Sequence, residues 1–179
     1  LLGVFNGGLL KWFENTDGQG TFAPPQQILD LDGGCAILEL ADVDNDFDID
    51  VLLVGDPGDD IKLLRNLGDG TFAPEEAIEL DAVPAALAIA DINGDGYKDI
   101  LVTLDFAEGP GVGIFFGSES GFGSLITHPG LHTGTASRSL QVGDMDLTGG
   151  LDLILNMAND SLVVARNVTG DASSWLVEP

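Results

Sequence analysis

Three short loops carry oxygen-bearing side chains at alternate positions, a pattern that suits the binding of a cation in a tight turn. In the loop of residues 91–99, "DINGDGYKD", these side chains stand at positions one, three, five and nine: Asp91, Asn93, Asp95 and Asp99. Gly96 at position six permits a sharp turn, and Tyr97 at position seven offers its backbone carbonyl. Because Ca²⁺ takes about 6–8 oxygen ligands in flexible geometry, this spacing predicts a calcium site.

Two further loops repeat the pattern with changes. In residues 42–50 the expected ligands are Asp42, Asp44, Asp46 and Asp50, with the backbone carbonyl of Asp48. Phe47 occupies position six there, so a positive φ would strain this loop by about 1 kcal/mol. In residues 144–152 the expected ligands are Asp144, Asp146, Thr148, Gly150 through its carbonyl, and Asp152. A hydroxyl is a weaker calcium ligand than a carboxylate, so we expect two well-formed sites and a weaker third.

The spacing separates these loops from other cation sites. An EF-hand closes with a glutamate later in its loop and is flanked by helices, whereas these loops close with aspartate at position nine. Mg²⁺ fits less well because it prefers rigid octahedral sites that retain water. The competing interpretation is a set of solvated acidic turns, but three such loops in phase with one repeat argue against it.

A repeat of about 50 residues organises the chain. The acidic loops begin at Asp42, Asp91 and Asp144, so their steps are 91 − 42 = 49 and 144 − 91 = 53. A second motif, seen in "KLLRNLGDGTFAP", has the same period, and its aligned positions are Asn15, Asn66, Gly117 and Asn167, followed by Phe22, Phe72, Phe122 and Trp175. We expect these aromatic residues to pack between neighbouring repeats; the alternative is that they are simply aromatic residues of a turn.

Each repeat contains four short apolar runs separated by Gly, Asn, Asp or Pro, which predicts four strands and no long helix. This is typical of a β-propeller blade. The expected fold is all-β: blades of four antiparallel strands in an open arc of about four blades. The expected segments are an incomplete first blade at 1–33 and later blades at 34–83, 84–135 and 136–179, in a single repeat array.

The acidic loop followed by the N-x-G-D-G-T-F turn resembles the FG-GAP/VCBS repeats of integrin-α-like β-propellers. The resemblance covers nearly the whole chain and is tightest in the middle repeat. It implies seven-bladed propellers with calcium in the loop between the first two strands of a blade. It also implies an extracellular or cell-surface setting, with roles in adhesion, glycan contact or support of secreted enzymes.

Composition and motifs narrow the function classes. The 179 residues hold 30 acidic and 6 basic side chains, a net charge of −24, which argues against nucleic acid and anionic membranes. No apolar run is long enough for a membrane span. Cys35 is expected in the core, and His128 and His132 in a loop. Trp12 either packs between blades or stacks on sugars. No hydrolase, phosphate-binding or zinc motif occurs, so we expect no enzyme.

The leading hypothesis is therefore a non-catalytic, calcium-stabilised β-propeller module of a secreted or cell-surface protein that serves adhesion and binds a protein or glycan. Two alternatives remain: a subunit of a self-assembling extracellular filament or surface layer, and an accessory or partial propeller of a secreted polysaccharide-degrading enzyme. The incomplete first blade suggests a longer chain or identical subunits that complete a strand or blade. Asn159 and Asn167 begin glycosylation acceptor patterns in predicted exposed turns.

Overall fold

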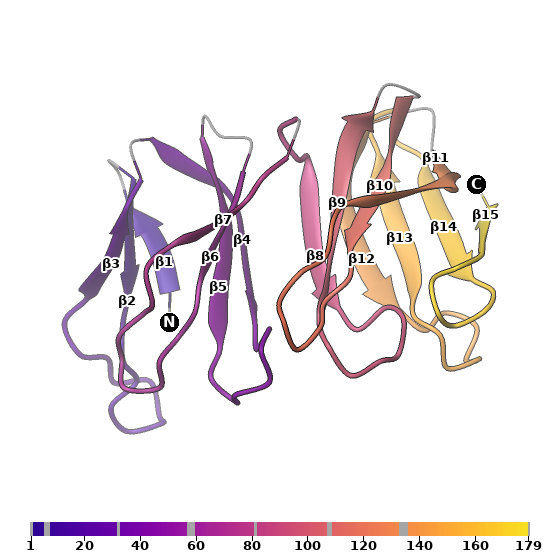
Figure 1. The fold of residues 1–179 in the computed structure, drawn as a ribbon. Helices are drawn as coiled ribbons and strands as arrows, with labels where there is room; N and C mark the ends of the chain where they lie inside the picture. The colour runs from indigo at the N-terminus through magenta and orange to yellow at the C-terminus, as the bar shows by residue number, and fades with distance from the viewer. Residues whose placement is uncertain are drawn as a thin grey trace. The chain divides into compact units, whose positions relative to one another are not determined.

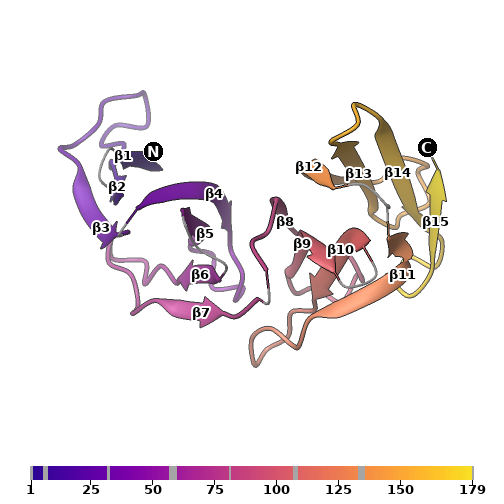
Figure 2. The same cartoon turned by 90° about the horizontal axis from the view of Figure 1, so that it is seen from above.

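All regular structure in the described part of the chain is β-strand. The computed structural model describes residues 2–5, 8–31, 33–56, 60–80, 82–106, 109–132 and 136–178. These residues form four sheets in which strands adjacent in sequence lie side by side (Figures 1 and 2). No helix in these ranges is long and apolar enough to cross a membrane. The predicted all-β class with blade-like antiparallel sheets is confirmed.

The first two sheets occupy the N-terminal part of the chain. One has three strands in the order β1 (Leu2–Phe5), β2 (Leu9–Trp12) and β3 (Gln26–Asp30). The next has four, in the order β4 (Gly34–Ala41), β5 (Asp50–Asp56), β6 (Ile61–Leu64) and β7 (Glu76–Ile78). Each sheet lies within one of the segments expected from the repeat.

The last two sheets each have four strands. One is ordered β8 (Ala86–Ala90), β9 (Asp99–Phe106), β10 (Gly109–Phe115) and β11 (Ile126–His132). The other is ordered β12 (Ser137–Gly143), β13 (Asp152–Met157), β14 (Leu162–Asn167) and β15 (Trp175–Glu178). Every pair of neighbours in these two sheets is antiparallel.

In each four-stranded sheet the second strand follows an acidic loop and begins with a run of consecutive apolar residues after its first aspartate. In β5 the residues Val51–Val54 are all buried, and in β9 so are Ile100–Leu104. Such a strand is paired on both edges and buried on both faces of the sheet. It therefore needs apolar residues at consecutive positions and not only at alternate positions. This is why the abrupt change from aspartate to Val, Ile and Leu marks the boundary between loop and strand.

The chain forms two compact units, each with its own core. One unit comprises Leu1–Leu38 with Asp50–Leu80, and the other comprises Glu39–Ile49 with Asp81–Pro179. In the first, buried Leu10, Leu53 and Leu64 form a core against which Cys35 and Phe72 pack. Cys35 is half-buried, and its thiol donates to the carbonyl of Ile37 (3.0 Å).

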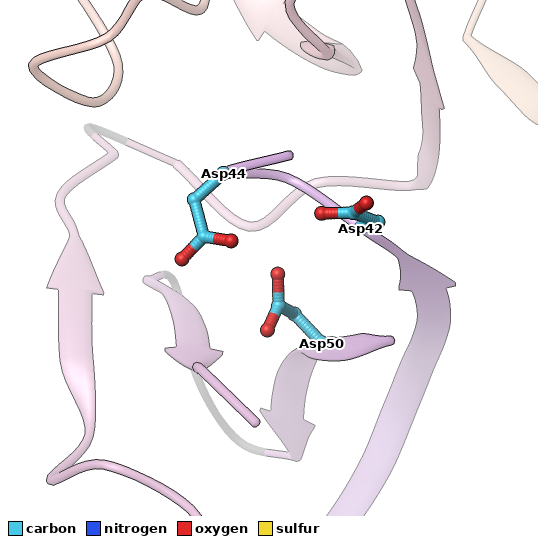
Figure 3. Close-up of side chains that lie close together, drawn as sticks. All are labelled: Asp42, Asp44 and Asp50. Atoms are coloured by element: carbon cyan, nitrogen blue, oxygen red, sulfur yellow. The ribbon is translucent and has the colours of Figure 1, made fainter. Parts of the chain in front are cut away.

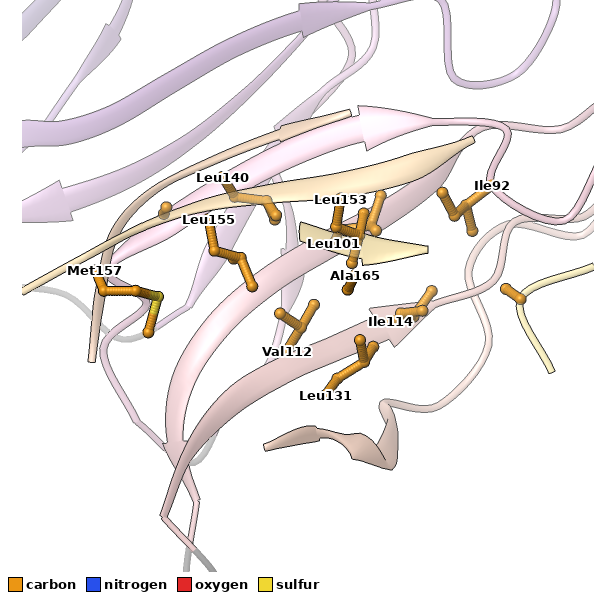
Figure 4. Packing of buried hydrophobic residues seen from close by; sticks show 12 residues of the cluster. Ile92, Leu101, Val112, Ile114, Leu131, Leu140, Leu153, Leu155, Met157 and Ala165 are labelled. Atoms are coloured by element: carbon orange, nitrogen blue, oxygen red, sulfur yellow. The ribbon is translucent and has the colours of Figure 1, made fainter. Parts of the chain in front are cut away.

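The second unit shows how two blades pack. Its core lies between the β8–β11 sheet and the β12–β15 sheet and includes Leu101, Ile114, Leu140 and Leu155 (Figure 4). Strand β8 lies beside β12, and β11 lies beside β15. First strand therefore meets first strand and last meets last, as in successive blades of a propeller.

The aromatic residues of the second motif behave differently from one repeat to the next. Phe72 and Trp175 pack against the two cores, as expected for residues between blades. Phe22 is 44% exposed, so the expectation that it is packed between repeats is wrong. It forms an isolated bridge with Asn15, which fixes its backbone rather than its side chain.

Candidate metal-binding loops

The aspartate at position nine of each acidic loop is the first residue of the second strand and is almost fully buried. Asp50, Asp99 and Asp152 are 0%, 0% and 1% exposed. Each accepts a hydrogen bond from the backbone N–H of an aligned residue in the second motif, as follows: Asn66 to Asp50 (2.8 Å), Gly117 to Asp99 (2.8 Å) and Asn167 to Asp152 (2.9 Å). In each of these repeats, the aspartate at position nine therefore joins the acidic loop to the second motif.

In the second and third acidic loops, the aspartate at position nine also accepts a backbone N–H from its own loop. Asp99 accepts from the N–H of Ile92, and Asp152 from the N–H of Met145, both at 2.9 Å. Burial raises the pKa of Asp99, and the neighbouring charges of Asp95 and Asp91 raise it further, while its backbone hydrogen bonds oppose the shift. This carboxylate thus lies where negative charge is poorly tolerated unless a positive charge is near.

The aspartate at position one organises the turn. Its carboxylate accepts backbone N–H groups from positions five and six, as in the bonds to Asp91 from Asp95 (3.0 Å) and Gly96 (2.9 Å). Asp42 accepts the equivalent pair from Asp46 and Phe47, and Asp144 accepts the N–H of Gly149. The loops therefore have one shared scaffold in which backbone donors face inward.

Positive φ at positions four and six bends all three loops. At position six the values are 75° for Phe47, 93° for Gly96 and 94° for Gly149. Phe47 thus has the positive φ at which strain is expected for a residue other than glycine, and it is 93% exposed. Position four has φ of 63° at Asn45, 76° at Gly94 and 60° at Leu147, so the third loop also contains a strained residue.

The carboxylates converge in the first and third loops. One oxygen from each of Asp42, Asp44 and Asp50 lies within 4.8 Å of the others, and these side chains point into one space (Figure 3). The same distance limit holds for Asp144, Asp146 and Asp152. Both trios occupy positions one, three and nine of their loops. These two clusters could hold a metal ion.

In the middle loop the third position is an amide. Asn93 Oδ1 accepts the N–H of Asp95 (3.0 Å), and Asn93 Nδ2 donates to Asp95 Oδ2 (2.9 Å). Asp95 also accepts the N–H of Tyr97 (2.9 Å). Asp91, Asn93 and Asp99 occupy the sequence positions of the two carboxylate trios, with a neutral oxygen replacing one charge.

The remaining predicted ligands lie on the same turns. Asp46 and Thr148, at position five, are exposed, and Asp48 and Tyr97 occupy position seven of their loops. Asp46 accepts the N–H of Asp48 (2.8 Å). Thr148 donates its hydroxyl to Asp146 Oδ1 (2.7 Å), a bond that lowers the pKa of Asp146. Their role as ligands stays a prediction.

The residues present fit a hard divalent cation. The donors are all oxygens, and Asp144 Oδ1 is buried without a hydrogen-bond partner among the described residues. A buried carboxylate oxygen without a partner is costly, and a cation would satisfy it. Hard cations such as Ca²⁺ and Mg²⁺ prefer oxygen ligands of this kind.

Asn167 corrects one expectation from the sequence. It was expected in an exposed turn as a glycosylation acceptor, but its side chain is only 3% exposed. Its Nδ2 donates to the carbonyl of Ile92 (3.0 Å), and its Oδ1 accepts the N–H of Ala172 (3.0 Å). The folded protein cannot present this amide for modification. Asn159 is exposed in a turn, as expected.

Sequence reasoning missed the bonds that tie loops of different repeats together. Asn45 Nδ2 donates to the carbonyl of Gly96 (3.1 Å), across 51 positions. Asn45 aligns with Gly94 at position four, which could have indicated the positive φ of Asn45. It could not have indicated the hydrogen bond to Gly96. The expectation of a loop at His128 and His132 is wrong, because both residues lie on β11; His128 Nε2 has no hydrogen-bond partner among the described residues, and the side chain of His132 lies outside them.

Comparison with known families agrees with this geometry. Residues 42–102 match the family model of the FG-GAP-like repeat, a segment that runs from the first acidic loop into β9. The resemblance expected from the loop and turn motifs is therefore confirmed over residues 42–102. No curated protein matches the chain.

Proposed function

We propose that this FG-GAP repeat protein is a non-catalytic, calcium-stabilised β-propeller module of a secreted or cell-surface protein, and that it contacts a protein or glycan in adhesion. The observation that carries the proposal is the shared scaffold of the acidic loops. In two of them, carboxylates from positions one, three and nine lie within 4.8 Å of one another. Such a cluster is unfavourable in the folded chain without a cation.

Calcium is the cation that suits these loops best. The ligand set includes backbone carbonyls and carboxylates in turns that bend at two positions, and calcium tolerates such irregular geometry. Buried Asp50, Asp99 and Asp152 would bind it from the strand side, and position one would do so from the turn side. The aspartates at position nine also accept a hydrogen bond from the backbone N–H of the second motif. A bound cation would therefore stabilise the contact between the two motifs as well as the loop.

The proposed extracellular location is supported by the calcium affinity that is usual for such modules. Extracellular modules bind calcium at roughly 10⁻⁴–10⁻³ M, which matches the calcium concentration outside cells. The net charge of −24 also favours a solvated surface and cation binding. A role without catalysis agrees with the absence of any recognised catalytic motif in the sequence.

Calorimetric titration with Ca²⁺ tests the proposal. The triple variant Asp42→Asn, Asp91→Asn, Asp144→Asn removes the position-one charges, while each amide oxygen can still accept one backbone N–H group of its turn. We expect calcium binding in the parent protein and its loss in this variant.

A matched control removes three other aspartates. Asp17, Asp69 and Asp171 lie in the turns of the second motif and are exposed, outside the acidic loops. Replacing all three by Asn changes the net charge equally and should preserve calcium binding. Equal loss of binding in both triple variants would show only general electrostatic attraction and would refute the proposed sites.

A further inference from the structure

A cleft in the first unit, which we call the Trp12 cleft, is outside the acidic loops. Its volume is about 490 Å³, within the range of about 300–1,000 Å³ that is usual for small-molecule sites. One wall comes from β2 and β3, and the other from the turn before β7. The side chains that matter for recognition are Trp12, Gln26, Gln27, Thr71, Phe72 and Glu75.

Trp12 departs from what the repeat requires for packing. Counting back three residues from the aligned Asn15, Asn66, Gly117 and Asn167 gives Trp12, Leu63, Ile114 and Val164. Leu63 and Ile114 are buried and Val164 is half-buried, as Trp12 is, but Trp12 is the one aromatic residue of the four and lines the cleft. The other three aligned positions hold aliphatic side chains, so the repeat itself does not require an indole here.

The opposite wall fits closely against the indole. Gly70 has φ of 87°, and a Cβ there would lie 3.3 Å from Trp12 Cζ2. Glycine therefore permits both the turn and the approach of the ring. The edge of the indole is held against this turn, which limits the number of orientations that Trp12 can adopt.

Polar groups surround the aromatic ring. Gln26 pairs with Trp12 across the two strands, and Gln27 follows it on β3; both side chains are exposed. Their amides can each donate and accept hydrogen bonds. Glu75 forms an ion pair with Lys62, so the carboxylate at this rim is charge-balanced. The cleft combines an apolar ring with neutral or neutralised hydrogen-bonding groups.

We propose that the Trp12 cleft binds a neutral saccharide, with Trp12 as the platform for the apolar face of a sugar ring. A sugar has C–H groups on its ring faces and hydroxyls around its edge, which match an aromatic surface bordered by amides. An anionic glycan is disfavoured by the strongly acidic chain. This inference specifies the ligand within the proposed function and rests on that function.

Tryptophan emission provides a direct measurement. The chain has two tryptophans, and Trp175 packs against the core of the other unit. A Trp175→Phe protein therefore reports on Trp12 alone. We expect its emission to shift and saturate with at least one member of a panel of neutral oligosaccharides of glucose, galactose, mannose, xylose and N-acetylglucosamine.

Two variants test the cleft without depending on a single substitution. Trp12→Leu restores the residue type of the aligned Leu63, so it should fold, and we expect at least tenfold weaker binding by calorimetry. The double variant Gln26→Ala, Gln27→Ala changes exposed side chains only, and we expect binding to be roughly fivefold weaker or more, as for the loss of one or two hydrogen bonds. Parent-like affinity in both variants would overturn the assignment of the site.

Calcium titration in parallel separates this inference from the proposed function. Saccharide binding without calcium binding would refute the calcium-stabilised module but retain the cleft assignment. Calcium binding with no response of Trp12 to any saccharide in the panel would overturn the cleft assignment alone. Occupation of the cleft by peptides from a random library, with no saccharide response, would likewise overturn it.

Discussion

Asn45 and Gly96, which are 51 positions apart in the chain, join two acidic loops: Asn45 Nδ2 donates to the carbonyl of Gly96 at 3.1 Å. Asn45 has φ of 63°, and its amide reaches position six of the next loop. Asn45 thus adopts the positive φ that its own turn requires, and its side chain makes a hydrogen bond to the neighbouring loop. This hydrogen bond links the two loops directly.

The first prediction concerns Asn45. Asn45→Gly keeps the positive φ accessible but removes the bond to Gly96, so we expect a loss of about 0.5–1.5 kcal/mol in unfolding free energy. Asn45→Ala loses the same bond and adds about 1 kcal/mol of left-handed strain. Chemical denaturation should rank the alanine variant below the glycine variant. Equal stability of the two would show that φ at this position has no cost.

The second prediction concerns Phe47. Its φ is 75° and its side chain is 93% exposed, so it contributes strain and little burial. We expect Phe47→Gly to raise the unfolding free energy by about 0.5–1 kcal/mol, the strain relieved less the added chain entropy. Leu67→Gly is the control, because Leu67 is exposed in a turn without positive φ and its replacement should destabilise. A loss of stability in Phe47→Gly would contradict the prediction.

The third prediction ranks two ligand positions. Asp95 supplies a carboxylate at position five, whereas Thr148 supplies a hydroxyl that already donates to Asp146 (2.7 Å). We expect Asp95→Ala to reduce calcium affinity at its loop more than Thr148→Ala does at the third. Calcium titration followed by NMR at each loop measures the two effects separately. Equal losses would contradict the assignment of position five.

The fourth prediction concerns Asn167. Its buried side chain satisfies the carbonyl of Ile92 and the N–H of Ala172. Asn167→Ala leaves two buried backbone groups unpaired, so we expect a loss of about 2–4 kcal/mol in unfolding free energy. Asn159→Ala, at an exposed turn with the same acceptor pattern, should lose well under half of that. Similar losses at both positions would contradict the structural role of Asn167.

The fifth prediction is a pKa. Hydrogen bonds from the side chains of Ser173 and Thr169, and from the backbone of Ser173, lower the pKa of Asp171 from 3.8 to about 2. An acid whose pKa is lowered by folding stabilises the fold at pH values above its unfolded pKa. For Asp171 this contribution is lost as the pH falls from 3.8 through about 2. NMR titration should show the pKa of Asp171 moving back toward its ordinary value in Ser173→Ala. An unchanged value would show that the Ser173 hydroxyl does not lower this pKa.

Local patterns predicted the loops and strands because their causes are local. Alternating oxygen side chains and a following apolar run are set by residues that are close to each other in the chain. Bonds between repeats could not be predicted in this way. The burial of Asn167 depends on Ile92, 75 positions away, and no property of the N-x-T pattern reveals it.

Two strained positions could have been found by alignment within the chain. Leu147 falls at the position of Gly94, and Ala172 at that of Gly70, and both have positive φ like the glycines they replace. The shape of the Trp12 cleft could not be found, because it depends on how the turn at Gly70 approaches β2. The sequence alone left two interpretations of Trp12, packing between blades and stacking on sugars.

The measurement that tests the central claim most directly is the unfolding free energy with and without calcium, at equal ionic strength. With sites of roughly 10⁻⁴–10⁻³ M, about 1 mM Ca²⁺ gives about 0.4–1.4 kcal/mol for each site. Three loops therefore predict an increase of about 1–4 kcal/mol over protein in chelator, lost in the variant with asparagine at Asp42, Asp91 and Asp144. An unfolding free energy that is the same in calcium and in chelator would contradict the account.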